Sequence, residues 1–300
     1  MNRAMKSAFI GTCTTILKQI LVALYGCSRQ PRHIESDPDR AAGLPFPSLN
    51  GIHHMSVSVT FVGSGDSFGS GGRFNTCFLV DAPGIRFCID FGASSLIALE
   101  RLGISHNTID TILLTHLHGD HCGGLPFLLV DAMLAAKRDR PLTIAGPPDT
   151  TDRLKSVAAA LMPGMEVMLP KFPITYIDMP TQRLHQIGPI KVLSYPAVHT
   201  KETNPTSLRV EVAGKVIAYT GDSEWTEHMP SLADGADLFI AECYFFQKPV
   251  RYHLNYPDIA KHRAEIRAKR VVLTHLGREM LANLDNVPEQ CAHDGLVIQL

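Results

Sequence analysis

The stretch Thr111-Ile-Leu-Leu-Thr-His-Leu-His-Gly-Asp-His-Cys-Gly-Gly124 places a dense group of metal-binding side chains directly after an apolar segment. Its apolar, β-branched beginning predicts a buried strand, and three imidazoles and one carboxylate follow within six residues. Alternation along an extended chain puts His116 and His118 on the same side, where both can reach one ion. Asp120 and His121 come where the chain turns into the next helix, so they can face a second ion nearby. Imidazole and carboxylate ligands suit zinc, and also manganese or iron where carboxylates are more numerous.

The composition of the whole chain is that of a globular protein with a large core. The 300 residues are 45% hydrophobic and 19% charged, which excludes a disordered chain and a disulfide-rich miniprotein. Because 28 Lys and Arg nearly balance 29 Asp and Glu, no global positive field would gather nucleic acid, and no DNA partner is expected. The seven cysteines form no CxxC pair, so we expect no disulfide framework, buried thiols at Cys77 and Cys88, and a cytoplasmic location.

The chain divides into an N-terminal extension, residues 1–54, and a catalytic domain, residues 55–300. The extension holds a largely apolar stretch that ends in Leu24-Tyr-Gly-Cys27 and is similar to a bacterial lipoprotein cleavage box. Lys18 interrupts the apolar run, and the unbroken remainder is too short to span a bilayer, so there is no strong membrane signal. We therefore expect an extension with a Pro-rich linker upstream of the domain, with a membrane-anchored lipoprotein as the alternative.

Within the domain, short apolar strands alternate with helical segments. The Ala82-Pro-Gly84 turn predicts a hairpin between two of these strands. Strand-rich halves with helices between them favour a layered α/β sandwich. Strands are expected at 56–63, 76–81, 85–90, 111–115 and 142–145 and near residues 175, 191, 207, 215, 238 and 270, and helices at 94–102, 125–136, 151–161 and 257–268.

The string His116-Leu-His-Gly-Asp-His121 resembles the signature of the metallo-β-lactamase superfamily, and the resemblance extends over about residues 56–300. It implies an αββα sandwich, in which two mixed β-sheets pack face to face, helices cover the outer faces and a metal site lies at one sheet edge. It also implies that the remaining ligands come from strand ends farther along the chain. His199, Asp222 and His275 each follow a predicted strand, in that order.

The resemblance assigns two divalent ions to the site, with zinc expected and manganese or iron as alternatives. One ion would be held by His116, His118 and His199, and the other by Asp120, His121 and His275, with Asp222 bridging. A carboxylate between two dications offsets their repulsion, and the two cations would let a bridging water lose a proton near neutral pH. Asp120 would also orient the resulting hydroxide. Asp90 resembles the buried aspartate behind the ligands in this superfamily, although a strand-ending turn residue is the alternative.

The segment from Ala241 to His275 is similar to the ribonuclease Z group of phosphodiesterases. That group has a glutamate and a histidine ahead of the last ligand, and Glu242 and His253 are the matching residues here. In the group, the histidine is thought to stabilise the developing phosphorane or to protonate the leaving oxygen, while the glutamate orients it. The alternative for His253 is a solvated loop residue. The Gly-rich segment 63–76 is similar to the group's first hairpin and is expected to form a flexible lip beside the metals.

Two departures bear on the substrate. Leu254-Asn255 stands where the group has Ser-Thr, and no long Gly/Pro-rich basic arm for gripping tRNA is present in the sequence. We therefore expect a phosphodiesterase that acts either on an RNA 3′ end or on a small or cyclic phosphodiester. The alternatives are a hydrolase of thioesters, lactones or β-lactams with the same metals, and a non-catalytic metal-binding module. Related enzymes are often dimers, which leaves a homodimer open.

Overall fold

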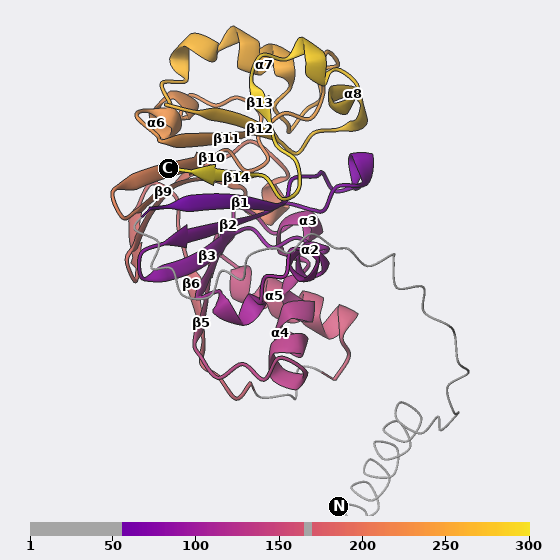
Figure 1. The fold of residues 1–300 in the computed structure, drawn as a ribbon, viewed down its shortest axis with the longest axis vertical. Coiled ribbons are helices and arrows are strands. Elements are labelled where there is room, and N and C mark those ends of the chain that lie inside the picture. Colours follow the sequence, from indigo (N-terminus) through magenta and orange to yellow (C-terminus); the bar gives the residue numbers. More distant parts are fainter. Residues whose placement is uncertain (1–55, 165–169) are drawn as a thin grey trace, which may run out of the picture. The chain divides into compact units, whose positions relative to one another are not determined.

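Two β-sheets of seven strands each form the centre of the computed structural model, which describes residues 56–164 and 170–300 (Figure 1). The predicted extension therefore lies outside the described residues. The first sheet has the order β14 (Val297–Gln299), β1 (Ser58–Gly63), β2 (Cys77–Ala82), β3 (Ile85–Ile89), β4 (Thr111–Leu113), β5 (Leu142–Gly146) and β6 (Ile174–Asp178). The second sheet has the order β13 (Gln290–Cys291), β12 (Val271–Thr274), β11 (Leu238–Glu242), β10 (Lys215–Tyr219), β9 (Thr206–Val212), β8 (Ile190–Pro196) and β7 (Leu184–Ile187).

Both sheets are mixed. In the first sheet β14, β1, β2 and β3 pair in antiparallel fashion, whereas β3, β4, β5 and β6 pair in parallel. In the second sheet β7 to β10 are antiparallel, and β10 to β13 are parallel. The strand β14 from the end of the chain pairs with β1 and so completes the first sheet.

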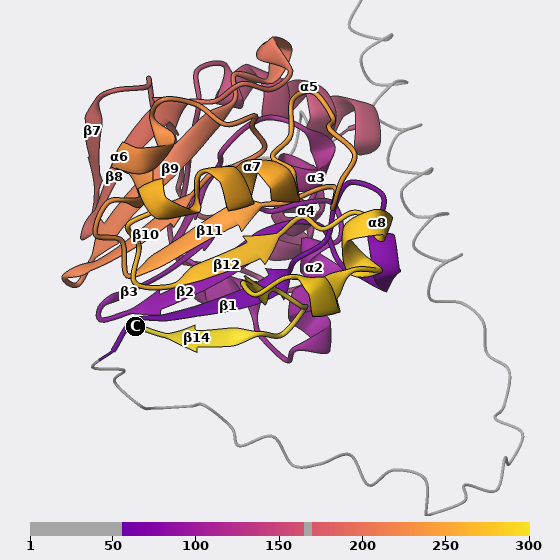
Figure 2. The same cartoon turned by 90° about the horizontal axis from the view of Figure 1, so that it is seen from above.

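Three apolar cores separate the layers. One lies between the sheets and includes Phe78 of β2 and Tyr219 of β10. The second lies beneath the helices on the outer face of the first sheet, and the third beneath those on the second sheet. Figures 1 and 2 show the two sets of helices on opposite sides of the paired sheets, which confirms the expected αββα sandwich. The first set is α2 (Ser95–Arg101), α3 (Gly119–Cys122), α4 (Leu125–Leu134) and α5 (Thr150–Leu161), and the second is α6 (Met229–Ala233), α7 (Tyr256–Lys261) and α8 (Arg278–Leu281).

Most predicted elements are present, but the helix expected at 257–268 is wrong in length. It ends as α7 at Lys261, and a 3-10 turn follows at Arg263–Glu265. The reason lies in the next residues. The carbonyl of Arg267 accepts a hydrogen bond from the Gly235 amide, and the Lys269 amide donates to the Ala236 carbonyl, so this segment runs alongside the turn before β11 and cannot remain helical.

The described residues also bear on the expected free cysteines and on the search for a membrane-spanning helix. The five cysteines found there are all free, and four of them are buried. Within residues 56–164 and 170–300, no helix is both long and apolar enough to cross a bilayer.

Phe78 tests the packing between the sheets. Its ring centroid lies 4.9 Å from that of Phe61 in its own sheet and 4.9 Å from that of Tyr219 in the opposite sheet. Phe78→Ala should lower the free energy of unfolding by about 3–5 kcal/mol, because the cavity cannot collapse between two sheets. Phe127→Ala on α4, where the side chain is 37% exposed, is the matched control and should cost less than about 1 kcal/mol in urea denaturation. Equal losses in the two variants would contradict this view of the core.

Candidate metal centre

Four strands of the second sheet deliver polar side chains to one edge. β8 and β10 run in the same direction, because each is antiparallel to β9, and β10, β11 and β12 are mutually parallel. The carboxyl ends of all four therefore meet at a single edge of the sheet. His199 follows β8, Asp222 follows β10, Glu242 ends β11 and His275 follows β12. Residues separated by up to 76 positions in the sequence are thus brought together by strand direction alone.

The first sheet contributes the histidine motif at the same edge. The Thr206 amide and hydroxyl both donate to the Thr115 carbonyl, at 3.0 and 2.7 Å, and so tie the end of β4 to the start of β9. Asp120 lies on the short helix α3, which packs closely against the residues after β3. A Cβ atom on Gly92 would lie 2.1 Å from the Asp120 carbonyl oxygen, so only glycine permits this approach.

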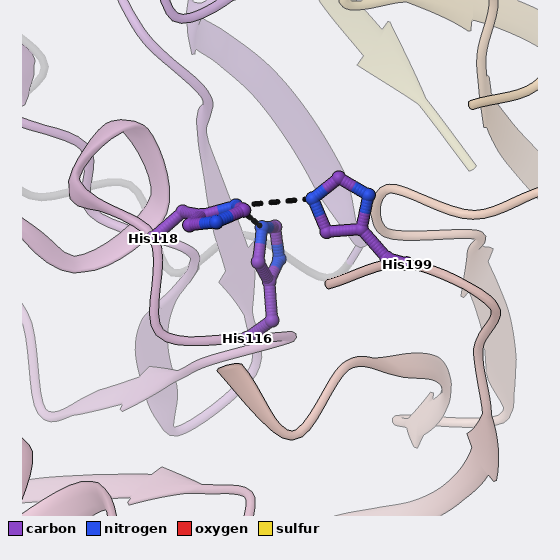
Figure 3. A group of neighbouring side chains, drawn as sticks. All are labelled: His116, His118 and His199. Carbon is purple, nitrogen blue, oxygen red and sulfur yellow. Dashed lines mark hydrogen bonds between the residues drawn. The ribbon is translucent and has the colours of Figure 1, made fainter. Parts of the chain in front are cut away.

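His116, His118 and His199 form the first group of side chains, which we call the histidine cluster (Figure 3). The His118 Nδ1 atom lies 3.2 Å from the His116 Nε2 atom and 3.0 Å from the His199 Nε2 atom. Tetrahedral ligands about 2.05 Å from a zinc ion are themselves roughly 3.3 Å apart. The spacing of these nitrogens therefore fits three ligands of one ion.

Asp120, His121, Asp222 and His275 form the second group, the mixed cluster, and all four are buried. The His121 Nε2 atom lies 3.5 Å from Asp120 Oδ2 and 3.3 Å from Asp222 Oδ1. The His275 Nε2 atom lies 3.3 Å from Asp120 Oδ2 and 3.5 Å from Asp222 Oδ2. Two imidazoles and two carboxylates at these distances can also surround a single ion.

Asp222 reaches both clusters. Its Oδ2 atom lies 4.0 Å from the Nε2 atoms of both His116 and His199, and the carboxylate also contacts His121 and His275 of the mixed cluster. The carboxylate thus has the position that a ligand shared by two ions requires.

Unpartnered polar atoms also fit a metal. Among the described residues, the buried His121 Nε2 and Asp222 Oδ1 atoms make no hydrogen bond, although they lie 3.3 Å apart. A buried polar atom without a partner costs about 1–3 kcal/mol. Both atoms face the interior of the mixed cluster, where a bound cation would remove that cost.

The two clusters differ in protonation. Burial lowers the pKa of every imidazole in the histidine cluster, which leaves neutral rings that can ligate metal directly. Burial alone would also lower the pKa of His275, but Asp222 and Asp120 outweigh it and raise that pKa to about 9. Asp222 and Asp120 likewise raise the pKa of His121, against the effect of burial. In return, the imidazoles hold the pKa of both carboxylates well below its usual range although burial opposes this. An ion entering the mixed cluster must therefore displace protons.

Contacts behind the clusters fix which ring nitrogen is free. The His121 Nδ1 atom lies 2.7 Å from Asp90 Oδ2, and the Asp90 carboxylate also accepts hydrogen bonds from the Thr115 amide and hydroxyl at 2.8 Å. The His199 Nδ1 atom donates to the Tyr252 carbonyl at 2.7 Å. Each contact leaves the Nε2 atom of the histidine directed at a cluster. Asp90 thus lies where the resemblance expects it.

Glu242 and His253 adjoin the mixed cluster. The His253 Nδ1 atom lies 2.8 Å from Glu242 Oε2 and 3.9 Å from Asp222 Oδ2. Glu242 is fully buried, whereas the side chain of His253 remains 20% exposed. Burial alone would lower the pKa of His253, but the negative charge of Glu242 outweighs it and raises that pKa. All nine site residues predicted from the sequence lie in three groups, two of which share Asp222 and His275.

Sequence reasoning missed Ser67, whose hydroxyl donates to Asp120 Oδ2. Ser67 belongs to the Gly-rich lip, which does lie beside the site but is tightly hydrogen-bonded. The Asp66 carboxylate accepts from the Phe68 and Ser70 amides within the lip, and Asp294 accepts from residues at both of its ends. These hydrogen bonds anchor the lip at both ends, while its expected flexibility stays a prediction. The contact with Asp120 spans 53 positions, so no local pattern in the sequence indicated it.

Known proteins share this fold and sequence pattern. The ribonuclease Z of Agathobacter rectalis is 26% identical over 280 residues, which cover 78% of this chain and 92% of the relative. The metallo-β-lactamase fold protein YhfI from Bacillus subtilis superposes with a TM-score of 0.68 at 19% identity, covering 82% of this chain and all of YhfI. The short form of human tRNase Z superposes with a TM-score of 0.63 at 22% identity, covering 80% of this chain and 98% of that structure.

These likenesses confirm a ribonuclease Z-like hydrolase of the metallo-β-lactamase superfamily. One family model is more specific, since it matches residues 57–295 and so spans nearly all of the described chain. The chain belongs to the family described as Anti-Pycsar protein Apyc1.

Proposed function

We propose that this chain is a dinuclear metal-dependent phosphodiesterase that cleaves a small or cyclic phosphodiester. The histidine cluster would hold one ion and the mixed cluster the other, with Asp222 shared between them. Two divalent ions would supply positive charge for the phosphate oxygens and would lower the pKa of water that serves as the nucleophile. Zinc suits the imidazole-rich ligand set, and manganese or iron are the alternatives.

The observation that carries the proposal is the Glu242–His253 pair beside the mixed cluster. The contact of 2.8 Å and the raised pKa of His253 favour a protonated imidazole at the edge of the site. Hydrolysis of a phosphodiester releases an alkoxide that needs a proton, and a positioned imidazolium can donate it. Buried Glu242 also accepts hydrogen bonds from the amides of Ser223 and Leu254, so the pair is held from two sides.

The carboxylate of Asp120 supports the same chemistry. Asp120 belongs to the mixed cluster and also contacts the lip, where the hydrogen bond from Ser67 limits the rotation of its carboxylate. A carboxylate held in this way can orient a nucleophilic water.

The described surroundings favour a small substrate. Between β5 and β8, the described residues form α5, β6 and β7, and no long basic arm extends from them. The basic run from Lys261 to Arg270 lies partly in α7 and partly in the turn before β12, and two of its charges pair with Asp234 and Asp237. Fewer charges are therefore available to track an RNA backbone. Processing of an RNA 3′ end is the alternative substrate class.

The proposal is tested by a substrate panel on metal-quantified protein. The panel contains bis-p-nitrophenyl phosphate, cyclic nucleotides, a precursor tRNA, and thioester, lactone and β-lactam reporters. We expect turnover of phosphodiesters, with cyclic nucleotides preferred over tRNA. His253→Ala should lower kcat by about 10²–10⁴-fold with metal content unchanged. His262→Ala, which removes a similarly buried imidazole paired with Glu265, is the matched control.

Turnover confined to the thioester, lactone or β-lactam reporters would replace the proposal with the second class of hydrolase. A metal-loaded protein that is inert on the whole panel would instead indicate a binding module.

Glu242→Gln tests the role of the buried carboxylate through pH. Because Glu242 raises the pKa of His253, its neutral amide should lower that pKa relative to the wild type. A general acid must be protonated, so kcat falls as pH rises through its pKa. The high-pH limb of the pH–kcat profile should therefore move to lower pH in Glu242→Gln. An unmoved or raised limb would show that His253 is not the acid.

Asp90→Asn tests the support of the mixed cluster. An amide nitrogen beside His121 Nδ1 would favour the tautomer that carries its proton on Nε2, which cannot ligate metal. Asparagine tolerates the φ of 59° at this position, so the fold should persist. Metal affinity, measured by competition with a chelator, should fall about 10–100-fold. Asp131→Asn, which alters the His106–Asp131 contact away from the site, is the matched control, and equal affinities in both variants would contradict the role.

A further inference from the structure

Tyr252 has a strained backbone beside the metal centre. Its φ is 70°, in the left-handed region that aromatic residues rarely occupy. Two other non-glycine residues at this site, Asp90 and His275, share the left-handed conformation, with φ values of 59° and 56°. Both have an evident role there, one behind His121 and one in the mixed cluster. Strain at a third position beside the same site calls for a functional reason.

A closed set of hydrogen bonds holds the Tyr252 main chain. Its carbonyl accepts from His199 Nδ1 at 2.7 Å, and its amide donates to Glu224 Oε1 at 2.7 Å. The Glu224 amide in turn donates to the Val198 carbonyl at 3.0 Å, next to His199. Tyr252 is thereby fixed relative to the histidine cluster.

The main-chain contact alone does not explain an aromatic side chain. Glycine would adopt the same φ without strain and would offer the same carbonyl to His199. The tyrosine ring is instead 39% exposed, and its centroid lies 6.3 Å from that of His199 at an interplanar angle of 90°. The Arg251 guanidinium lies 5.0 Å from the centroid of the Tyr252 ring, so a positive charge adjoins the ring.

A hollow adjoins the histidine cluster at His199. It has a volume of about 360 Å³, and its walls include four proline side chains and Lys201. The hollow is much larger than a phosphate, although neither Tyr252 nor Arg251 lines it.

We propose that Tyr252 is a specificity-determining residue that stacks on the nucleobase of a nucleotide substrate while the phosphodiester lies at the metal centre. The inference rests on the proposed phosphodiesterase function and adds to it a residue that recognises the substrate. A rigid, partly exposed ring loses little conformational entropy on stacking. The positive charge of Arg251 beside the ring would attract the negatively charged nucleotide.

The test compares two substrates, a 3′,5′-cyclic nucleotide and the 3′,5′-cyclic phosphate of 1-O-methylribose, which has no base. Tyr252→Gly removes the ring but keeps the carbonyl for His199. The ratio of kcat/KM for the nucleotide to kcat/KM for the abasic compound should fall roughly 10- to 100-fold, chiefly through KM. Tyr252→Phe, which retains the ring, should restore most of the ratio. Calorimetry with a nucleoside monophosphate and ribose 5-phosphate should show the same selective loss of binding.

Ala213→Gly is the control for strain. Ala213 has a φ of 48° in the turn between β9 and β10. Relieving the backbone strain at this distant position should leave the ratio of the two kcat/KM values unchanged. If Tyr252→Gly lowers kcat/KM equally for both substrates, so that their ratio keeps the wild-type value, the stacking role is overturned while the phosphodiesterase proposal stands. If the wild-type protein cleaves neither compound nor any other phosphodiester, the proposed function fails and this inference fails with it.

Discussion

The buried carboxylate of Asp222 is the constraint on which the centre depends. It is 2% exposed, and its ion-pair partners within the described residues are all histidines. An isolated charge at such a position would be very costly, so positive charge must accompany it. Protonated His121 and His275 provide that charge without metal, and divalent cations can replace the protons. The same carboxylate is therefore balanced by protonated histidines in one state and would hold the ions in the other.

The topology makes this arrangement possible. The polar residues follow strands that run in one direction. Each of them therefore lies within a few residues of the common sheet edge. The hydrogen bonds from Thr206 to the Thr115 carbonyl join the two sheets at that edge, which keeps the histidine motif opposite Asp222. Inter-sheet packing around Phe78 and Tyr219 then sets the separation of the layers. The clusters are thus held by the main framework of the sandwich, which suits a preorganised site.

Sequence reasoning succeeded where the signal was local or repeated. The apolar run before His116 and the spacing of the motif predicted one strand, one turn and the side chains they present, and the alternation of strands and helices predicted the layers. The distant residues Asp222 and His275 needed the family resemblance, since a single residue after a strand is ordinary on its own.

Contacts between remote loops could not be predicted. Ser67 meets Asp120 across 53 positions, and the Tyr252 carbonyl meets His199 across another 53, yet neither residue has a local pattern that names its partner. The strands β13 and β14 have two and three residues, too few for a periodicity, and exist because β12 and β1 offer them unpaired edges.

The account's central claim is that two ions share Asp222, and anomalous X-ray diffraction from metal-soaked crystals tests it most directly. We expect two peaks per chain about 3.5–4 Å apart, one within ligand distance of the histidine cluster and one within ligand distance of the mixed cluster. A single peak at saturating metal, or two peaks that do not share the Asp222 carboxylate, would contradict it.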